Sequence, residues 1–273
     1  MTLYVTDLDG TFLRSDTSIS EYTVRTINRL IESETLFTYA TARSFASASP
    51  LVKKLDLRCP AITFNGAFIV DPRTGEHIVE NGYSEKSRAI AMDFFMSENT
   101  APLVYAQING EERVSYLETH MDNIQSYVDA RRGDKRLRPV KEFKALFEGE
   151  PFYFTIINPD DITALDKIFN AENGFARNVQ KDTYDDYYWY EIYNHTASKA
   201  NAVLQVKQLV KADKVVCFGD NLNDISMIEA ADLGIAVSNA QDELKKAADL
   251  IIDGNNDDGV AKFIEKSDSR RCC

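Results

Sequence analysis

The chain has 273 residues, with 31 Lys and Arg against 43 Asp and Glu, which gives a formal net charge of −12. This acidic balance argues against a surface that binds nucleic acid or an anionic membrane. A hydrophobic fraction of 44% and a charged fraction of 27% are ordinary for a globular chain with one large domain or two smaller ones.

The N-terminal residues and the cysteines bear on location. Asp7 and Asp9 interrupt the only apolar stretch of the N-terminus, so we expect neither a signal peptide nor a transmembrane span. The cysteines have no metal-ligand or CxxC spacing, which predicts reduced thiols and a cytoplasmic protein. We expect Cys217 in the core and Cys272 and Cys273 in an exposed tail.

Residues 3 to 80 alternate short β-branched runs with amphipathic ones. The predicted strands are Leu3–Thr6, Leu36–Ala40 and Ala61–Phe64, and the predicted helices are Glu21–Glu32 and Ser44–Leu55. A capping box from Ser18 to Glu21 marks the first helix. This βαβαβ order predicts a parallel sheet, and a hairpin of Ala67–Val70 and His77–Glu80 follows it.

The segment between Gly82 and Tyr187 has a different pattern. The predicted helices are Ser84–Ser97, Thr119–Ala130 and Pro159–Asn170, and the predicted strands are Leu103–Ile108, Arg113–Leu117, Phe152–Ile157 and Phe175–Gln180. The turn Asn109-Gly110 predicts antiparallel pairing of the strands beside it. We therefore expect an α+β insert.

After Thr196 the α/β alternation returns. The predicted helices are Ser198–Val210, Asn221–Ala230, Gln241–Ala247 and Asp258–Lys266, and the predicted strands are Lys214–Phe218, Gly234–Val237 and Leu250–Asp253. These elements predict a core formed by residues 1–81 and 191–273, interrupted by an inserted domain at 82–190. The fold class is α/β.

Carboxylates gather after two predicted strands, and this is the strongest chemical signal. Asp7-Leu8-Asp9-Gly10-Thr11 follows the first strand, and Gly219-Asp220-Asn221-Leu222-Asn223-Asp224 follows Lys214–Phe218. Open α/β sheets bind ligands at the carboxyl ends of their strands. If the two strands are neighbours, Asp7, Asp9, Asp220 and Asp224 converge and require a cation, and oxygen ligands alone favour Mg²⁺. A solvated turn and a helix cap are the alternatives.

Weaker signals lie at the same predicted sheet edge. Thr41-Ala42-Arg43 offers a hydroxyl, backbone amides and a guanidinium to a phosphate, or Thr41 simply caps a helix. Lys199 stands in the first turn of a helix, where a cation is unfavourable, which indicates a ligand role or an exposed lysine. Asn65-Gly66 is a candidate substrate contact or a simple turn.

With these motifs in this order, the sequence resembles the haloacid dehalogenase-like superfamily of phosphohydrolases, in its Cof-type branch, subclass IIB. The DxDGT motif matches Asp7 to Thr11, the second-strand threonine matches Thr41, the motif lysine matches Lys199, and GDxxND matches Gly219 to Asp224. Ala42 and Ala200 stand where the family often has glycine. The resemblance covers the whole chain and implies a Rossmann-like core with an inserted cap domain that selects the substrate.

The resemblance also implies roles. Asp7 would be the nucleophile and Asp9 the general acid and base. Mg²⁺ would bind Asp7, the Asp9 backbone carbonyl, Asp220 and Asp224. The groups that would hold the phosphoryl oxygens are the Leu8 and Ala42 amides, Thr41, Lys199 and Asn223, and Arg43, Asn65 and Gly66 are possible substrate contacts. The implied function is a Mg²⁺-dependent phosphatase of small phosphorylated metabolites.

Two other functions stay open, a phosphotransferase or phosphomutase on the same scaffold and a non-enzymatic phospho-switch. The intact pair Asp7 and Asp9 favours the phosphatase, and Asp9 and Asp220 argue against the switch. A basic run from Arg131 to Arg138 is either a solvated face or a contact for a second anionic group. The aromatic run Tyr187–Tyr193 either packs in a sheet or covers a sugar or ring of the substrate. The sequence predicts no oligomeric state and no role for the histidines.

Overall fold

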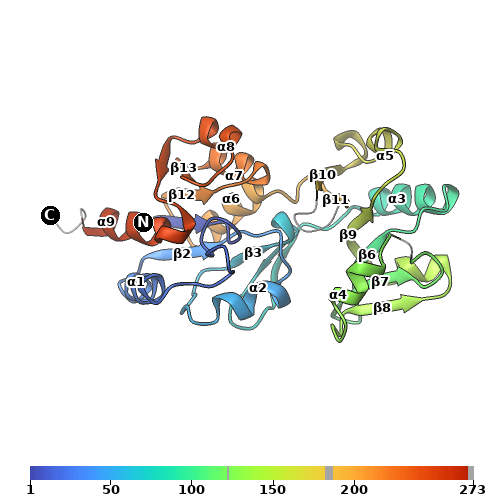
Figure 1. The fold of residues 1–273 in the computed structure, drawn as a ribbon, viewed down its shortest axis with the longest axis horizontal. Coiled ribbons are helices and arrows are strands. Elements are labelled where there is room, and N and C mark those ends of the chain that lie inside the picture. Colours follow the sequence, from blue (N-terminus) through green and yellow to red (C-terminus); the bar gives the residue numbers. More distant parts are fainter. Residues whose placement is uncertain (122, 182–186, 270–273) are drawn as a thin grey trace. The chain divides into compact units, whose positions relative to one another are not determined.

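The computed structural model describes residues 1–121, 123–181 and 187–269, and the chain divides into two compact units (Figure 1). The core unit comprises Met1–Glu80 and Ala197–Cys273, and the inserted unit comprises Asn81–Thr196. The chain re-enters the core unit beyond the predicted residue 190 because β11 (Tyr188–Asn194) is hydrogen-bonded to strands of the inserted unit. The predicted tail cysteines lie outside the described residues.

The core unit has a five-stranded parallel sheet in the order β14-β13-β12-β1-β2. The strands are β1 (Thr2–Thr6), β2 (Leu36–Tyr39), β12 (Lys214–Gly219), β13 (Leu233–Val237) and β14 (Leu250–Ile252). β1 and β12 are direct neighbours, although more than 200 residues separate them in the chain. The carboxyl ends of these two strands therefore meet at one edge of the sheet.

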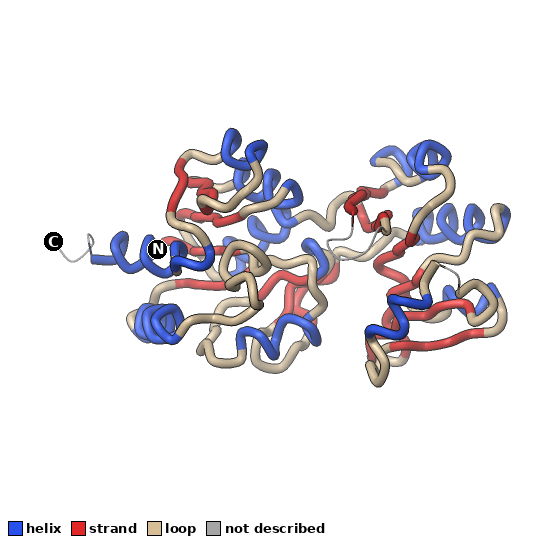
Figure 2. Tube along the Cα trace, viewed as in Figure 1, coloured by secondary structure: helices blue, strands red, loops and turns tan. Residues whose placement is uncertain are grey.

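Helices flank this sheet (Figure 2). They are α1 (Glu21–Glu32), α2 (Phe45–Val52), α6 (Lys199–Leu209), α7 (Ile225–Ala230), α8 (Asp242–Ala247) and α9 (Gly259–Ser269). The N-cap of α1 is Ser20, whose side chain accepts a hydrogen bond from the Thr23 amide, so the predicted capping box at Ser18 is wrong. Ser18 instead bonds Asp16 in the preceding turn.

The third predicted strand only touches the parallel sheet. β3 (Ala61–Thr63) pairs antiparallel with β4 (Phe68–Val70), which pairs with β5 (His77–Glu80). Its link to the parallel sheet is one bridge between Ala40 and Ile62, because β2 has already ended at Tyr39. The prediction of a third full parallel strand is corrected accordingly, whereas the α/β class is confirmed.

The inserted unit has a six-stranded sheet in the order β10-β11-β9-β6-β7-β8, antiparallel except for the pair β7 and β8. The strands besides β11 are β6 (Leu103–Ile108), β7 (Glu111–Leu117), β8 (Leu137–Val140), β9 (Glu150–Ile157) and β10 (Phe175–Lys181), and the helices are α3 (Glu85–Ser97), α4 (Gln125–Ala130) and α5 (Ile162–Ile168). α4 and α5 are shorter than predicted, and β8 has no counterpart among the predicted strands.

The aromatic strand β11 packs as a strand with two faces. Tyr190 and Ile192 are fully buried in the main apolar core of the inserted unit, beside Phe154 and Phe95. On the other face, the Tyr193 ring stacks on Tyr153 at 5.7 Å between ring centroids. Sheet packing therefore explains the buried face of the predicted aromatic run.

No described helix is long and apolar enough to cross a membrane. Cys59 and Cys217 are buried free thiols, as the apolar surroundings of Cys217 in the sequence predicted. Burial raises the pKa of both thiols, which keeps them protonated.

Candidate active site

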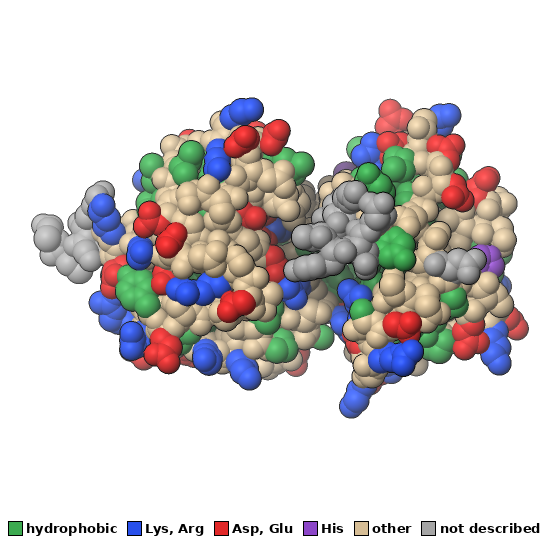
Figure 3. Space-filling view, in the orientation of Figure 1, with side chains coloured by type: hydrophobic (Ala, Val, Ile, Leu, Met, Phe, Trp, Pro, Cys, Tyr) green, Lys and Arg blue, Asp and Glu red, His purple; other side chains and the backbone are tan. Residues whose placement is uncertain are grey.

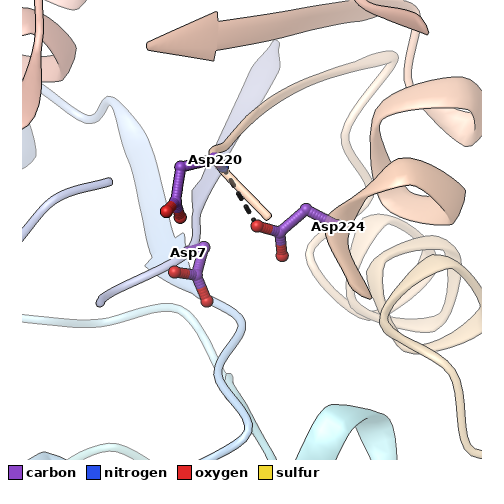
Figure 4. Close-up of side chains that lie close together, drawn as sticks. All are labelled: Asp7, Asp220 and Asp224. Atoms are coloured by element: carbon purple, nitrogen blue, oxygen red, sulfur yellow. Dashed lines mark hydrogen bonds between the residues drawn. The ribbon is translucent and has the colours of Figure 1, made fainter. Parts of the chain in front are cut away.

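Three buried or half-buried carboxylates meet at the carboxyl ends of β1 and β12 (Figure 4). Asp7 directly follows β1, and its amide donates to the Phe218 carbonyl of β12 at 2.9 Å. Asp220 follows β12, and Asp224 ends the single 3₁₀ turn Leu222–Asp224 before α7. One oxygen of each carboxylate lies within 4.8 Å of the others, so the predicted convergence of these three aspartates is present.

Lys199 lies between two of these carboxylates. It is the first residue of α6, and its side chain is almost fully buried. Its Nζ donates to Asp7 Oδ1 at 2.5 Å and to Asp224 Oδ1 at 2.6 Å. Burial alone would lower the pKa of Lys199, but the attraction of the two carboxylates outweighs it and raises the pKa, so the side chain stays cationic.

Burial dominates the acidity of two of the aspartates. It raises the pKa of Asp7 well above the usual range, although Lys199 offsets part of the shift. It raises the pKa of Asp220 to about 6, against the opposing hydrogen bond from Thr11. Three carboxylates and one ammonium leave two uncompensated negative charges when all are ionised, and this excess fits a divalent cation.

Asp224 also has a structural role. Its second oxygen accepts the amides of Asp220 and Asn221, each at 3.1 Å, and with Asn221 it forms a capping box. Asp224 is therefore both a helix cap and a member of the predicted carboxylate cluster. Its position is fixed by the backbone, so its other oxygen is free to hold Lys199.

Gly10 and Thr11 position Asp220, a role that sequence reasoning missed. The Thr11 hydroxyl donates to Asp220 Oδ1 at 2.7 Å. Gly10 has a φ of +77°, and a Cβ there would lie 2.4 Å from Asp220 Oδ2. Only glycine fits both the backbone conformation and the space. The signal was present in the DxDGT motif, which joins these residues to the aspartates.

Asp9 does not join the carboxylate cluster with its side chain. Instead, Arg43 Nε and NH2 form a two-bond ion pair with the Asp9 carboxylate, at 2.7 and 2.6 Å. This hydrogen bonding raises the pKa of Arg43. The Arg43 guanidinium, which the sequence predicted to contact a phosphate or substrate, is thus bound to Asp9 in this structure.

The other predicted phosphate-holding residues lie around the same sheet edge. Thr41 is buried after β2, and its hydroxyl accepts the Arg43 amide at 3.1 Å. Leu8 is buried, and Ala42 is exposed at the start of the loop. The Asn223 side-chain amide donates to Asn65 Oδ1 at 3.3 Å, which brings a residue of the GDxxND motif to the Asn65-Gly66 turn.

A family model described as haloacid dehalogenase-like hydrolase matches residues 4–264. The chain belongs to the haloacid dehalogenase-like hydrolases. It is 25% identical over 280 residues to the 5-amino-6-(5-phospho-D-ribitylamino)uracil phosphatase YitU of Bacillus subtilis, an alignment that covers 97% of this chain and 96% of the relative. This relationship confirms the predicted family and supports a phosphatase.

Solved structures agree with this haloacid dehalogenase-like fold. TM0651 from Thermotoga maritima superposes with a TM-score of 0.75 at 26% identity, over 97% of this chain and 96% of that one. The subclass IIB sugar phosphatase BT4131 superposes with a TM-score of 0.73 at 18% identity, over 97% and 98% of the two chains. The second similarity shows the fold, including the kind of insert that the resemblance implied.

Three of the five basic residues in the run of the inserted unit are ion-paired with neighbouring acids. Arg132 pairs with Asp129, Arg136 with Asp134 and Glu112, and Arg138 with Glu148. The Arg131 guanidinium lies 3.9 Å from the centroid of the Tyr127 ring. On the face that Figure 3 shows, basic and acidic side chains are interspersed over the inserted unit. These contacts favour the solvated-face interpretation.

Proposed function

We propose that this enzyme is a Mg²⁺-dependent phosphatase of small phosphorylated metabolites, acting through an aspartyl-phosphate on Asp7. The observation that carries the proposal is the buried Asp7 carboxylate. It is held by Lys199, lies beside Asp220 and Asp224, and precedes Asp9 by two residues. A carboxylate oriented by a buried cation, with a second acid nearby, suits covalent phosphoryl transfer.

The proposed reaction has two steps. An Asp7 carboxylate oxygen forms a bond to phosphorus as the bond to the leaving alcohol breaks. Asp9 enters this step protonated, with one of its two hydrogen bonds from Arg43 released, and gives that proton to the leaving oxygen. Asp9 then takes a proton from water, which attacks the phosphorus and releases Asp7 and inorganic phosphate. The Leu8 and Ala42 amides, Thr41, Lys199 and Asn223 hold the phosphoryl oxygens and stabilise their charge.

The proposed metal ligands are Asp7, the Asp9 backbone carbonyl, Asp220 and Asp224. Oxygen donors and an uncompensated double negative charge suit Mg²⁺ better than a softer metal. When bound, Mg²⁺ supplies positive charge to the phosphoryl group. Lys199 keeps two of the acids oriented in the metal-free protein.

The proposed substrates are sugar phosphates or similar phosphomonoesters, because YitU acts on a phosphorylated ribityl compound. We also propose that the inserted domain, predicted at 82–190, selects among them, and that the protein is cytoplasmic. A phosphomutase is less well supported, since Arg136 and Arg138 of the basic run that could anchor a second phosphate are ion-paired.

Hydrolysis of p-nitrophenyl phosphate with Mg²⁺, and its loss in EDTA, tests the activity. A panel of sugar phosphates, pyridoxal phosphate and flavin mononucleotide, ranked by kcat/KM, then tests the substrate class. We expect the highest value for a phosphorylated sugar or sugar alcohol. Absence of Mg²⁺-dependent hydrolysis would contradict the proposal, and isomerisation of a hexose phosphate seen by NMR would favour the mutase.

Metal binding should depend on pH through Asp220. Its pKa of about 6 in the fold exceeds the usual aspartate value, so the metal-free protein loses stability as the pH rises from about 4 to 6. Mg²⁺ needs ionised ligands, so Asp220 alone makes the affinity fall about tenfold for each pH unit below 6, and the raised pKa of Asp7 makes the fall steeper. We therefore expect Mg²⁺ to raise the Tm much more at pH 7.5 than at pH 5.

Differential scanning fluorimetry with and without Mg²⁺ measures this difference. Asp220→Asn removes one metal ligand and one titrating group, so Mg²⁺ should raise the Tm of this variant only slightly at both pH values. An equal Mg²⁺-induced shift of the wild type at pH 5 and pH 7.5 would contradict the linkage.

The Arg43 pair should matter most for poor leaving groups. An alkoxide leaving group needs a proton from Asp9, whereas nitrophenolate leaves without protonation. Arg43 fixes the orientation of Asp9 through two hydrogen bonds. We expect Arg43→Ala to lower kcat/KM about tenfold or more for an alkyl phosphate and less for p-nitrophenyl phosphate. Arg43→Lys keeps the charge without the two-bond geometry, so its kcat/KM for the alkyl phosphate should lie between those of the wild type and Arg43→Ala. Equal losses on both substrates would refute a positioning role.

A further inference from the structure

The Asn65-Gly66 turn has an unusual backbone. Phe64, Asn65 and Gly66 have consecutive φ values of 49°, 53° and 102°. Positive φ is unfavourable for a residue with a side chain, most of all for a bulky one such as phenylalanine. Such strain persists where the surrounding structure imposes it, and it concentrates at functional sites.

Neighbouring parts of the active site impose this conformation. The Phe64 amide donates to the Arg43 carbonyl and the Asn65 amide to the Thr41 carbonyl, both at 3.0 Å. A Cβ on Gly66 would lie 2.4 Å from the carbonyl oxygen of Ser198, the N-cap of the helix that begins with Lys199. The turn Phe64–Gly66 therefore packs between the loop that contains Thr41 and the start of α6.

The Asn65 side chain is buried with an unused donor. It is 4% exposed, and its Oδ1 accepts the Asn223 amide at 3.3 Å. With the Asn223 amide oriented as in this structure, exchanging Asn65 Oδ1 and Nδ2 would set two NH₂ groups against each other, so Asn65 Oδ1 is assigned as the acceptor of this bond. Nδ2 has no hydrogen-bond partner within the described parts of the chain. A buried donor without a partner calls for a functional explanation.

We propose that Asn65 Nδ2 donates a hydrogen bond to a phosphoryl oxygen of the bound substrate. This inference rests on the proposed function and adds a donor to it. Asn65 touches the Thr41 loop through its backbone and Asn223 through its side chain, and both of these residues are assigned to phosphoryl oxygens. A phosphoryl oxygen accepts hydrogen bonds, so it matches a group that can only donate.

Two substitutions at Asn65 separate its amide from its backbone. Asn65→Gly tolerates positive φ and deletes the amide, and Asn65→Asp keeps the size but replaces the donor with an anion. Inorganic phosphate, measured as a competitive inhibitor of p-nitrophenyl phosphate hydrolysis, probes the site. We expect its affinity to fall about tenfold in Asn65→Gly and about a hundredfold in Asn65→Asp, because a hydrogen bond to a charged group is lost or reversed.

The matched control is Asn109→Gly. Asn109 also has a positive φ, 54°, but lies in a hairpin turn of the inserted unit. The Asn109→Gly variant should therefore bind phosphate as tightly as the wild type. The Mg²⁺-induced rise in Tm without phosphate should persist in both Asn65 variants, since Asn65 is not a metal ligand. A selective loss of phosphate affinity supports the inference.

Unchanged phosphate affinity in Asn65→Asp would overturn the inference. So would a loss of affinity matched by an equal loss of the Mg²⁺-induced shift, because that pattern indicates a collapsed site. These outcomes differ from failure of the proposed function, which appears as a wild-type protein that hydrolyses no phosphomonoester. An active wild type with unaffected Asn65 variants leaves the phosphatase proposal standing.

Discussion

Asp7→Asn is expected to lower kcat by about 10⁴-fold or more, because an amide cannot form the aspartyl-phosphate that the proposed mechanism requires. The fold should survive. Asp7 is a buried carboxylate with a raised pKa, so its neutral isostere removes a charge that is costly to bury. Lys199 keeps its second partner, Asp224. The metal-free Tm of the variant should equal or exceed that of the wild type.

Two measurements test this result: kcat from steady-state kinetics, and the amount of phosphoprotein trapped by acid quenching. The wild type should yield a phosphoprotein with a saturating substrate, and Asp7→Asn should yield none. Asp242→Asn is the matched control, since the Asp242 side chain is 85% exposed on α8 and its kcat should not change. If Asp7→Asn keeps more than about a tenth of the wild-type kcat, Asp7 is not the nucleophile.

Lys199→Met should damage both stability and catalysis. The substitution leaves Asp7 and Asp224 buried without their cation, and breaking a buried ion pair from one side costs about 3–5 kcal/mol in the free energy of unfolding. Loss of a charge-stabilising donor also lowers kcat/KM on the order of 10²-fold to 10³-fold. Mg²⁺ should restore part of the stability, because it replaces positive charge, but not the activity.

Lys207→Met is the control on the same helix. Lys207 pairs with Asp232 at 2.8 Å, and both side chains are partly exposed. A surface pair of this kind contributes less than about 1 kcal/mol, so urea unfolding and kcat/KM should be nearly unchanged. Similar losses of stability for the two variants would show that Lys199 does not compensate the buried acids.

Much of the candidate site could be predicted because its residues lie in short motifs at strand ends. Asp7, Asp220 and Asp224 converge as expected, since neighbouring parallel strands present their carboxyl ends at one edge. The engagement of Arg43 by Asp9 could not be predicted, because it depends on side-chain geometry across two loops. The strained turn at Phe64 could not be predicted either, because no local propensity places a phenylalanine at positive φ.

The sequence by itself determined most of the element types, the interruption of the parallel core and the motifs, because hydrophobic period, turn residues and motif spacing are local properties. Tertiary structure decided what depends on pairing between distant segments. It assigned β3 to an antiparallel sheet, β11 to the inserted unit, and the Asn65 turn to a position between Thr41 and Ser198. Hydrogen bonds and steric contacts between residues far apart in the chain fix these features, and no local pattern records them.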